Sequence, residues 1–159
     1  MTVPSADPLQ SAFPRAEISR PADGTPTVRV PLAELVDAVR RVRGPLHHAR
    51  FVDLTAVDRL SREDRFELVY LFYSMQHQTW LRLKTRTDGE APSITPLVPA
   101  ANWYEREVFD LFGIRFDGHP DLRRIMLPDD WQGHPLRRTE PIGAEPVDFT
   151  VTRSAYGTG

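Results

Sequence analysis

The spacing of proline divides this chain into a part that can hold regular secondary structure and two flanking parts that cannot. Residues 1–26 contain five of the fifteen prolines among small polar residues, a composition that predicts an extended, mobile lead-in. From residue 118 onward a proline recurs at intervals of at most eight residues. Neither an ordinary helix nor a central strand tolerates that spacing, because proline lacks a backbone N–H. The sequence therefore predicts a lead-in over 1–26, an α/β domain over 27–117 and an extended arm over 118–159.

Composition excludes several classes of function. The length of 159 residues suits one domain with a real core. There is no cysteine, which excludes disulfides, thiolate zinc sites and cysteine-ligated iron–sulfur clusters on this chain. A formal net charge of -2 gives no general attraction to nucleic acid. No apolar run is long enough to span a bilayer and the start lacks a signal-peptide layout, so a soluble intracellular protein is expected.

The middle of the chain has the periodicities of one helix and several strands. Pro31 suits a first helical position, and apolar residues then recur at helical spacing until Gly44, which predicts an amphipathic helix lying on a sheet. Strands are predicted over residues 27–30, 50–57, 66–73 and 79–87. The third of these is apolar on both faces and is expected to be a central strand. The expected fold class is α+β, a small mixed sheet with one or two packed helices followed by an extended C-terminal arm.

The last predicted strand carries a basic stripe. Its alternation places Trp80, Arg82, Lys84 and Arg86 on one face of the sheet. Such a stripe is typical of a solvated sheet face. The alternative is a docking surface for an acidic or phosphate-bearing partner.

A second helix is predicted from its end signals. Asn102 is a good N-cap, and Glu105 three residues later completes the pattern of a capping box. Gly113 is a natural left-handed C-cap. Glu105, Glu107 and Asp110 crowd the polar side, where carboxylates at helical spacing suggest a divalent metal or acid–base chemistry. The helix dipole alone also favours early carboxylates, and no cysteine or histidine nearby completes a ligand set.

The arm contains two near-copies of a Gly-His-Pro unit, beginning at Gly118 and Gly133. Each places a histidine on a stiff turn, so His119 or His134 with Asp121 is a candidate acid–base pair for a hydrolase. Neither histidine has a serine or cysteine nucleophile beside it, which favours the alternative that each caps a turn or hydrogen-bonds a backbone carbonyl. Each unit also precedes an arginine pair suited to bind carboxylates across an interface. These pairs are Arg123-Arg124 and Arg137-Arg138.

The arm is too apolar for a free tail and too interrupted by proline for a core. Ordering one residue costs about 1–2 kcal/mol of backbone entropy, whereas burying one large apolar side chain returns only about 1.5–3 kcal/mol. With about one such side chain in four or five residues, the arm needs a surface to pack against. A groove on the chain itself could supply it, but a partner protein is the stronger candidate.

The ordered motifs of residues 105–137 resemble the signature of the C subunit of NADH-quinone oxidoreductase, the 30 kDa-type subunit of respiratory complex I. The resemblance rests on Glu105-Arg106-Glu107 with Asp110, on Phe112-Gly113-Ile114 and Phe116, and on the segments 118–125 and 133–137. It implies a structural and assembly component with no catalytic, cofactor or metal site on this chain. NADH, flavin, iron–sulfur clusters and quinone are then expected on partner subunits, chiefly the homologues of the D and B subunits. The complex would hold the chain peripherally on the cytoplasmic side of the bacterial inner membrane, without nucleic acid.

The partner-binding residues expected from the motifs and the resemblance lie on the helix and the arm. They are Trp103, Glu105, Arg106, Glu107, Asp110, His119, Asp121, Arg123, Arg124, Trp131, His134, Arg137 and Arg138. After Arg137 the family usually continues with a basic residue, an aspartate and an aromatic before proline, whereas this chain has Thr139-Glu140. The family also has related members in other complexes, such as membrane-bound hydrogenases. The alternative is therefore an equivalent scaffold subunit of such a complex.

Overall fold

The computed structural model describes residues 7–60 and 63–140. Its centre is a mixed five-stranded sheet with the order β1-β2-β5-β4-β3, in which only β2 and β5 are parallel neighbours. The strands are β1 (Glu17–Ser19), β2 (Thr27–Arg29), β3 (Arg50–Asp58), β4 (Phe66–Ser74) and β5 (Thr79–Thr87). The three long strands agree with the predicted ones to within one residue. β4 is an inner strand, as its apolar sequence indicated.

Two helices pack on one face of this sheet. They are α2 (Leu35–Arg43), which follows the short 3-10 helix η1 (Leu32–Glu34), and α3 (Ala101–Phe112). Their buried side chains share one core with the inward-facing residues of the strands, such as Leu68, Tyr70 and Leu83. The predicted α+β class, a small mixed sheet with packed helices, is therefore confirmed.

The segment before the sheet differs from the predicted mobile lead-in. Residues 7–19 form α1 (Pro8–Ala12) and then β1, which pairs with β2. Leu9 and Phe13 are buried in the core, and the guanidinium of Arg41 lies over the Phe13 ring. Two apolar anchors in so short a segment leave no helical period to detect in the sequence, although they are enough to fix it on α2. Residues 1–6 lie outside the described residues.

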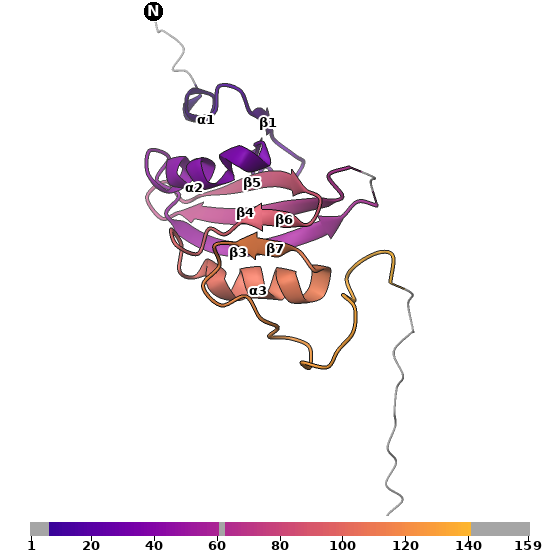
Figure 1. Cartoon of the computed structure of the whole chain (residues 1–159). Coiled ribbons are helices and arrows are strands. Elements are labelled where there is room, and N and C mark those ends of the chain that lie inside the picture. Colours follow the sequence, from indigo (N-terminus) through magenta and orange to yellow (C-terminus); the bar gives the residue numbers. More distant parts are fainter. Residues whose placement is uncertain (1–6, 61–62, 141–159) are drawn as a thin grey trace, which may run out of the picture.

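A second sheet has two strands, one before and one after α3 in the sequence, and the arm begins after the second of them. Its parallel strands are β6 (Glu90–Pro92) and β7 (Arg115–Asp117). The part of the arm that the structure describes, residues 118–140, contains no helix or strand and runs beside α3, in orange in Figure 1. Residues 141–159 of the predicted arm lie outside the described residues. Within the described ranges, no helix has the length and apolar character needed to cross a membrane.

Candidate functional site

Glu105 lies on the side of α3 that was predicted to be polar, but it is fully buried. It accepts hydrogen bonds from the Ile94 backbone N–H at 2.7 Å, from Thr95 Oγ1 at 2.9 Å and from Ser93 Oγ at 2.5 Å. Burial raises the pKa of Glu105, and these three donors oppose the rise. The capping-box prediction was wrong: α3 begins at Ala101 with no side-chain cap, because Glu105 holds the preceding loop instead of Asn102.

Asp110, one and a half turns later, holds the arm. Its Oδ2 accepts the consecutive backbone N–H groups of Ile125, Met126 and Leu127 at 3.0, 2.8 and 2.9 Å, and its Oδ1 accepts from Arg124 at 2.7 Å. Burial alone would raise the pKa of Asp110, but the three N–H groups and the guanidinium outweigh it and lower the pKa. The carboxylate therefore stays ionised and fixes the backbone of the arm at one point.

The first Gly-His-Pro unit docks on the beginning of α3. His119 Nε2 donates to the Asn102 carbonyl at 3.2 Å, while its Nδ1 accepts the Asp121 backbone N–H at 3.0 Å. This pattern assigns the neutral Nε2–H tautomer. Arg106 then reaches back from α3 to the arm, where its guanidinium donates to the carbonyls of Arg123 and Arg124 at 3.1 and 3.3 Å.

The second unit caps the end of α3, whose last carbonyls have no partner within the helix. His134 Nδ1 donates to the Asp110 carbonyl at 2.8 Å, and the Leu136 backbone N–H donates to the Leu111 carbonyl at 3.1 Å. Arg137 Nε donates to the Phe112 carbonyl at 2.6 Å and also places positive charge at the negative end of the helix dipole. Gly113 is the predicted left-handed C-cap, with φ of 73°, and its lack of a side chain makes room for His134 and Arg137.

The end of the described arm is fixed to the sheet by Asp58, which sequence reasoning missed. Asp58 Oδ2 accepts the Arg138 backbone N–H at 3.0 Å and pairs with Arg65 at 2.5 Å. Arg65, with help from the Leu60 and Arg138 N–H groups, lowers the pKa of Asp58 strongly against the effect of burial. The only sequence signal was that Asp58 ends a strand, which does not distinguish it from an ordinary turn aspartate.

The predicted partner-binding residues therefore separate into two groups. Seven are used inside the chain to hold the arm or the loop before α3: Glu105, Arg106, Asp110, His119, Arg124, His134 and Arg137. The rest have exposed or half-buried side chains: Trp103, Glu107, Asp121, Arg123, Trp131 and Arg138. Binding of a partner by these residues stays a prediction. The sequence made a partner protein the stronger candidate for the surface against which the arm packs. In the structure, residues 118–140 pack against α3 of their own chain.

Two large apolar side chains on this side of the molecule are strongly exposed, one from the second group and one that was not predicted. Trp103 is 64% exposed and Met126 61% exposed, although both are large and apolar. Arg106 lies 5.0 Å from the centre of the Trp103 ring, in a cation–π contact that holds the indole on the surface. Arg123 is also exposed, and among the described residues it forms an ion pair only with the neighbouring Asp121, at 2.8 Å. We call Trp103, Arg123 and Met126 the arm surface. Met126 had no distinguishing sequence signal.

The geometry does not favour the catalytic alternatives. Both histidines proposed for a hydrolase bind backbone carbonyls, so their ring nitrogens serve the fold. Two of the three carboxylates proposed for a metal, Glu105 and Asp110, are occupied by protein donors. Over residues 7–60 and 63–140, no group of three potential ligands is close enough to hold a metal ion.

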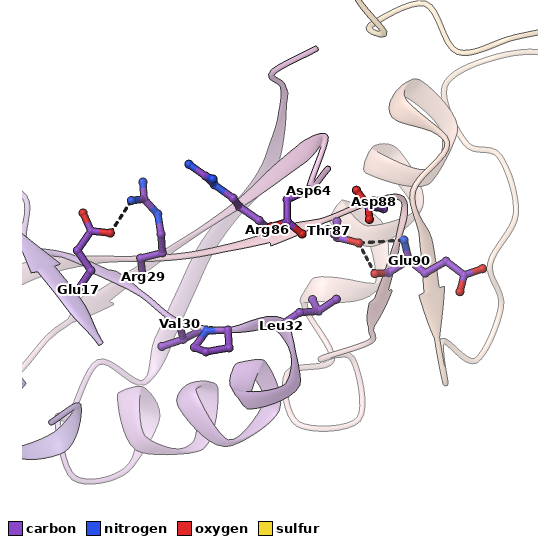
Figure 2. A pocket seen from close by; sticks show the side chains of 10 residues that line it. Glu17, Arg29, Val30, Leu32, Asp64, Arg86, Thr87, Asp88 and Glu90 are labelled. Atoms are coloured by element: carbon purple, nitrogen blue, oxygen red, sulfur yellow. Dashed lines mark hydrogen bonds and ion pairs between the residues drawn. The ribbon is translucent and has the colours of Figure 1, made fainter. Parts of the chain in front are cut away.

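A cavity of about 770 Å³ is lined by residues of β1, β2, η1, β5 and β6 (Figure 2). Arg29 and Arg86 line it together with four carboxylates, and Arg29 is paired with Glu17 at 2.8 Å. The acidic side chains outnumber the basic ones, so the cavity offers no concentrated charge of one sign for a small ionic ligand. The carboxylates are those of Glu17, Asp64, Asp88 and Glu90.

Comparison with known proteins agrees with the resemblance. Residues 28–146 match the family described as "Respiratory-chain NADH dehydrogenase, 30 Kd subunit". The C subunit of NADH-quinone oxidoreductase from Roseiflexus castenholzii is 44% identical over 151 residues, which cover 91% of this chain and 87% of that protein. The C/D subunit of the same enzyme from Methylococcus capsulatus is 45% identical over 139 residues, which are 80% of this chain but only 24% of that longer protein.

Two solved structures have the same fold. A trypsin-resistant fragment of Nqo5 superposes with a TM-score of 0.63 at 28% identity, covering 72% of this chain and 96% of the fragment. A chain of the membrane-bound sulfane sulfur reductase, an archaeal respiratory membrane complex, superposes with a TM-score of 0.67 at 29% identity, covering 77% of this chain and 74% of that chain.

Proposed function

This chain belongs to the 30 kDa subunit family of respiratory-chain NADH dehydrogenase, and we propose that it is a non-catalytic structural and assembly subunit of complex I, the NADH-quinone oxidoreductase. In this role the chain breaks no bond itself. It holds neighbouring subunits of the peripheral arm in place while they transfer electrons to quinone. Membership of the family, which the sequence motifs indicated, is confirmed by the family match and by relatives about 44% identical over most of the chain.

The observation that carries the proposal is the internal fixation of the arm along α3. The polar groups that a catalytic site would need are already hydrogen-bonded within the chain. They belong to Asp110, Arg106 and the second Gly-His-Pro unit. What they leave outside is the arm surface, apolar and aromatic with one exposed arginine. Aromatic, methionine and arginine side chains are the types enriched at protein interfaces. Because the arm is already ordered, a partner would not have to supply the entropy of ordering it.

The partners and cofactors follow from the family as part of the same proposal. The homologues of the D and B subunits are the expected neighbours, and the relative whose name joins C and D supports the proximity of a D-type subunit. NADH, flavin, iron–sulfur clusters and quinone are assigned to partner subunits, since this chain contains no cysteine to ligate a cluster. The chain is then peripheral, on the cytoplasmic side of the bacterial inner membrane, and is held there through the complex.

The test replaces the native chain by a tagged Trp103→Ala, Arg123→Ala double variant and recovers the complex from membranes. Loss of an aromatic anchor and an interfacial arginine is expected to lower recovery of the neighbouring subunits at least about tenfold. Arg40→Ala is the matched control, because Arg40 is also exposed and pairs with a nearby aspartate, Asp37, at 2.6 Å. The unfolding temperature of the free double variant should stay near that of the unmodified chain. Full recovery of an active complex with the double variant would refute the proposal.

The second candidate is the equivalent scaffold of a related membrane complex fed by another electron donor. The structural likeness to a chain of the sulfane sulfur reductase complex favours it. The subunits that co-purify with the tagged chain separate the two candidates: flavin-containing NADH-oxidising subunits identify complex I, and their replacement by hydrogenase-type or sulfur-reducing subunits identifies the alternative.

A further inference from the structure

Glu105 and His119 meet in the interior, where the first Gly-His-Pro unit of the arm docks on α3. Both side chains are fully buried, and His119 Nε2 lies 3.9 Å from Glu105 Oε2. The same Nε2–H donates to the Asn102 carbonyl at 3.2 Å. The imidazole therefore lies between two oxygen acceptors, a backbone carbonyl to which it is hydrogen-bonded and a carboxyl group to which it is not.

The charge of Glu105 decides which acceptor the imidazole binds. A hydrogen bond to an ionised carboxylate is roughly twice as strong as one between neutral groups, and its N···O distance is about 2.7–2.9 Å. An ionised Glu105 would therefore draw the Nε2–H away from the Asn102 carbonyl by a shift of about 1 Å. A protonated Glu105 competes poorly, because its Oε2 is already bonded to the Ser93 and Thr95 hydroxyls. The bond to Asn102 is thus the arrangement expected for the acid form of Glu105.

The groups around Glu105 suit the acid form. Burial raises the pKa of Glu105, so its proton is retained to higher pH than that of an exposed glutamate. A proton on Oε2 can be donated to Ser93 Oγ, 2.5 Å away, because a hydroxyl group both donates and accepts. The buried hydroxyl of Tyr70, from β4, has no hydrogen-bond partner among the described residues. Burial raises the pKa of Tyr70, and a charge on Glu105 raises it further.

Within the described ranges no arginine or lysine forms an ion pair with Glu105. Arg106, the next residue of α3, is turned toward the arm, where it donates to the carbonyls of Arg123 and Arg124. The carboxylate of Asp121 is exposed and pairs with Arg123. His119 is the titratable side chain that lies within ion-pair distance of Glu105, so a change of charge on Glu105 acts first on the imidazole.

The first Gly-His-Pro unit is built to follow a movement of the imidazole. His119 Nδ1 accepts the Asp121 backbone N–H at 3.0 Å, so a shift of the ring is passed to the next residues of the arm. Gly118, with φ of 76°, has open space around it, which leaves room for the corner to move. In the second unit, His134 donates to the Asp110 carbonyl at 2.8 Å and forms no ion pair with a carboxylate of the described residues. The two near-copies therefore differ in that only the first has a carboxyl group beside its histidine.

We propose that His119 is a proton-dependent switch, which exchanges its Nε2–H hydrogen bond from the Asn102 carbonyl to the Glu105 carboxylate when Glu105 loses its proton. In this step one proton passes from Glu105 to water, and the neutral imidazole keeps its own proton on Nε2. The exchange shifts the first Gly-His-Pro unit relative to α3. The switch concerns contacts within the chain, so it does not rest on the binding of a partner.

The experiment is a pH titration of the full chain by NMR, with ¹³C in the glutamate carboxyl groups and ¹⁵N in the backbone and the histidine rings. The Glu105 carboxyl is expected to titrate at higher pH than the exposed glutamates. The Asp121 amide and His119 Nε2 signals should shift with the same midpoint, while the His119 ring stays neutral and the His134 signals do not follow. An Asp121 amide that does not follow Glu105 overturns the proposal. An imidazolium signal appearing at the step does so too, because His119 would then be the titrating group.

Glu105→Gln supplies the matched variant. Glutamine has nearly the shape of the acid form, and its NH₂ replaces the acid O–H toward Ser93 Oγ. The Asp121 and His119 signals should therefore lose the pH step and stay at their positions in the acid form. Glu107→Gln is the control, because Glu107 is half-buried on the same helix, and it should leave the step unchanged. A step that persists in the folded Glu105→Gln variant refutes the switch. If that variant does not fold, the titration of the unmodified chain decides.

Discussion

Glu105 and Asp110 are two buried carboxylates of one helix whose pKa values are displaced in opposite directions. The difference lies in their partners. Glu105 is held by two hydroxyl groups and one N–H, which do not outweigh its burial, whereas Asp110 has three N–H groups and a guanidinium. Asp110 therefore acts as a fixed charge at which the arm folds back, and Glu105 as a hydrogen-bond acceptor that shapes the loop before α3.

Asp110→Asn is expected to lower the free energy of unfolding by about 2–4 kcal/mol at pH 7. An amide can offer its oxygen to the three N–H groups only by turning its own NH₂ toward Arg124, so donors then face each other. The measurement is urea unfolding, with Asp37→Asn as control because Asp37 is an exposed partner of Arg40. A loss no larger than that of the control would contradict the role given to Asp110.

The same variant has a pH signature. The folded pKa of Asp110 is below its unfolded value of about 3.9, so the folded state binds fewer protons and this contribution is complete above about pH 4. It is lost as the pH falls through the folded pKa. The difference in unfolding free energy between the unmodified chain and Asp110→Asn should therefore shrink below about pH 4. Parallel stability curves down to pH 3 would show that the charge of Asp110 contributes nothing.

The end of α3 depends on Gly113 for two separate reasons. Its φ of 73° suits glycine, and a Cβ there would collide with the His134 ring and the Arg137 guanidinium. Gly118 has almost the same φ, 76°, but open space around it. Gly118→Ala should cost only the left-handed strain, about 1 kcal/mol. Gly113→Ala should cost at least about twice that and expose the arm to protease cleavage. Equal effects of the two substitutions would show that the arm does not depend on the cap.

The elements that sequence could predict are those whose signals are local. Alternation and period located β3, β4, β5 and α2, and one glycine marked the end of α3. The start of α3 was mispredicted because Glu105 serves a loop ten to twelve residues earlier, a tertiary contact that overrides a local capping pattern. The burial of Asp110 could not be predicted from the sequence either. Its helix face reads as polar, and only the arm, a segment without any period of its own, makes it an interior face.

The main sheet separates two surfaces of different kinds. On the side of α3, the arm closes the polar face of the helix and presents Trp103, Arg123 and Met126. The opposite side carries the outward residues of β3, β4 and β5, among them the basic stripe of Arg82, Lys84 and Arg86. The sequence placed the basic stripe of β5 correctly on one face, but not its neutralisation, because Glu67 is brought to Lys84 and Arg29 only by strand pairing.

Comparison of a chain ending at Asp117 with one ending at Glu140 tests whether the arm belongs to the fold of its own domain. The shorter chain leaves Asp110 without its N–H donors and Arg106 without its two carbonyls, and it uncovers the last carbonyls of α3. Each lost cap or satisfied charge is worth about 1 kcal/mol or more, so a loss on the order of 4 kcal/mol is expected in urea unfolding. The chain ending at Glu140 keeps every one of these contacts, so the loss is measured against it. If the chain ending at Asp117 were as stable as the full chain, the arm would contribute nothing to the domain, and its contacts along α3 would have to be replaced by those of a partner.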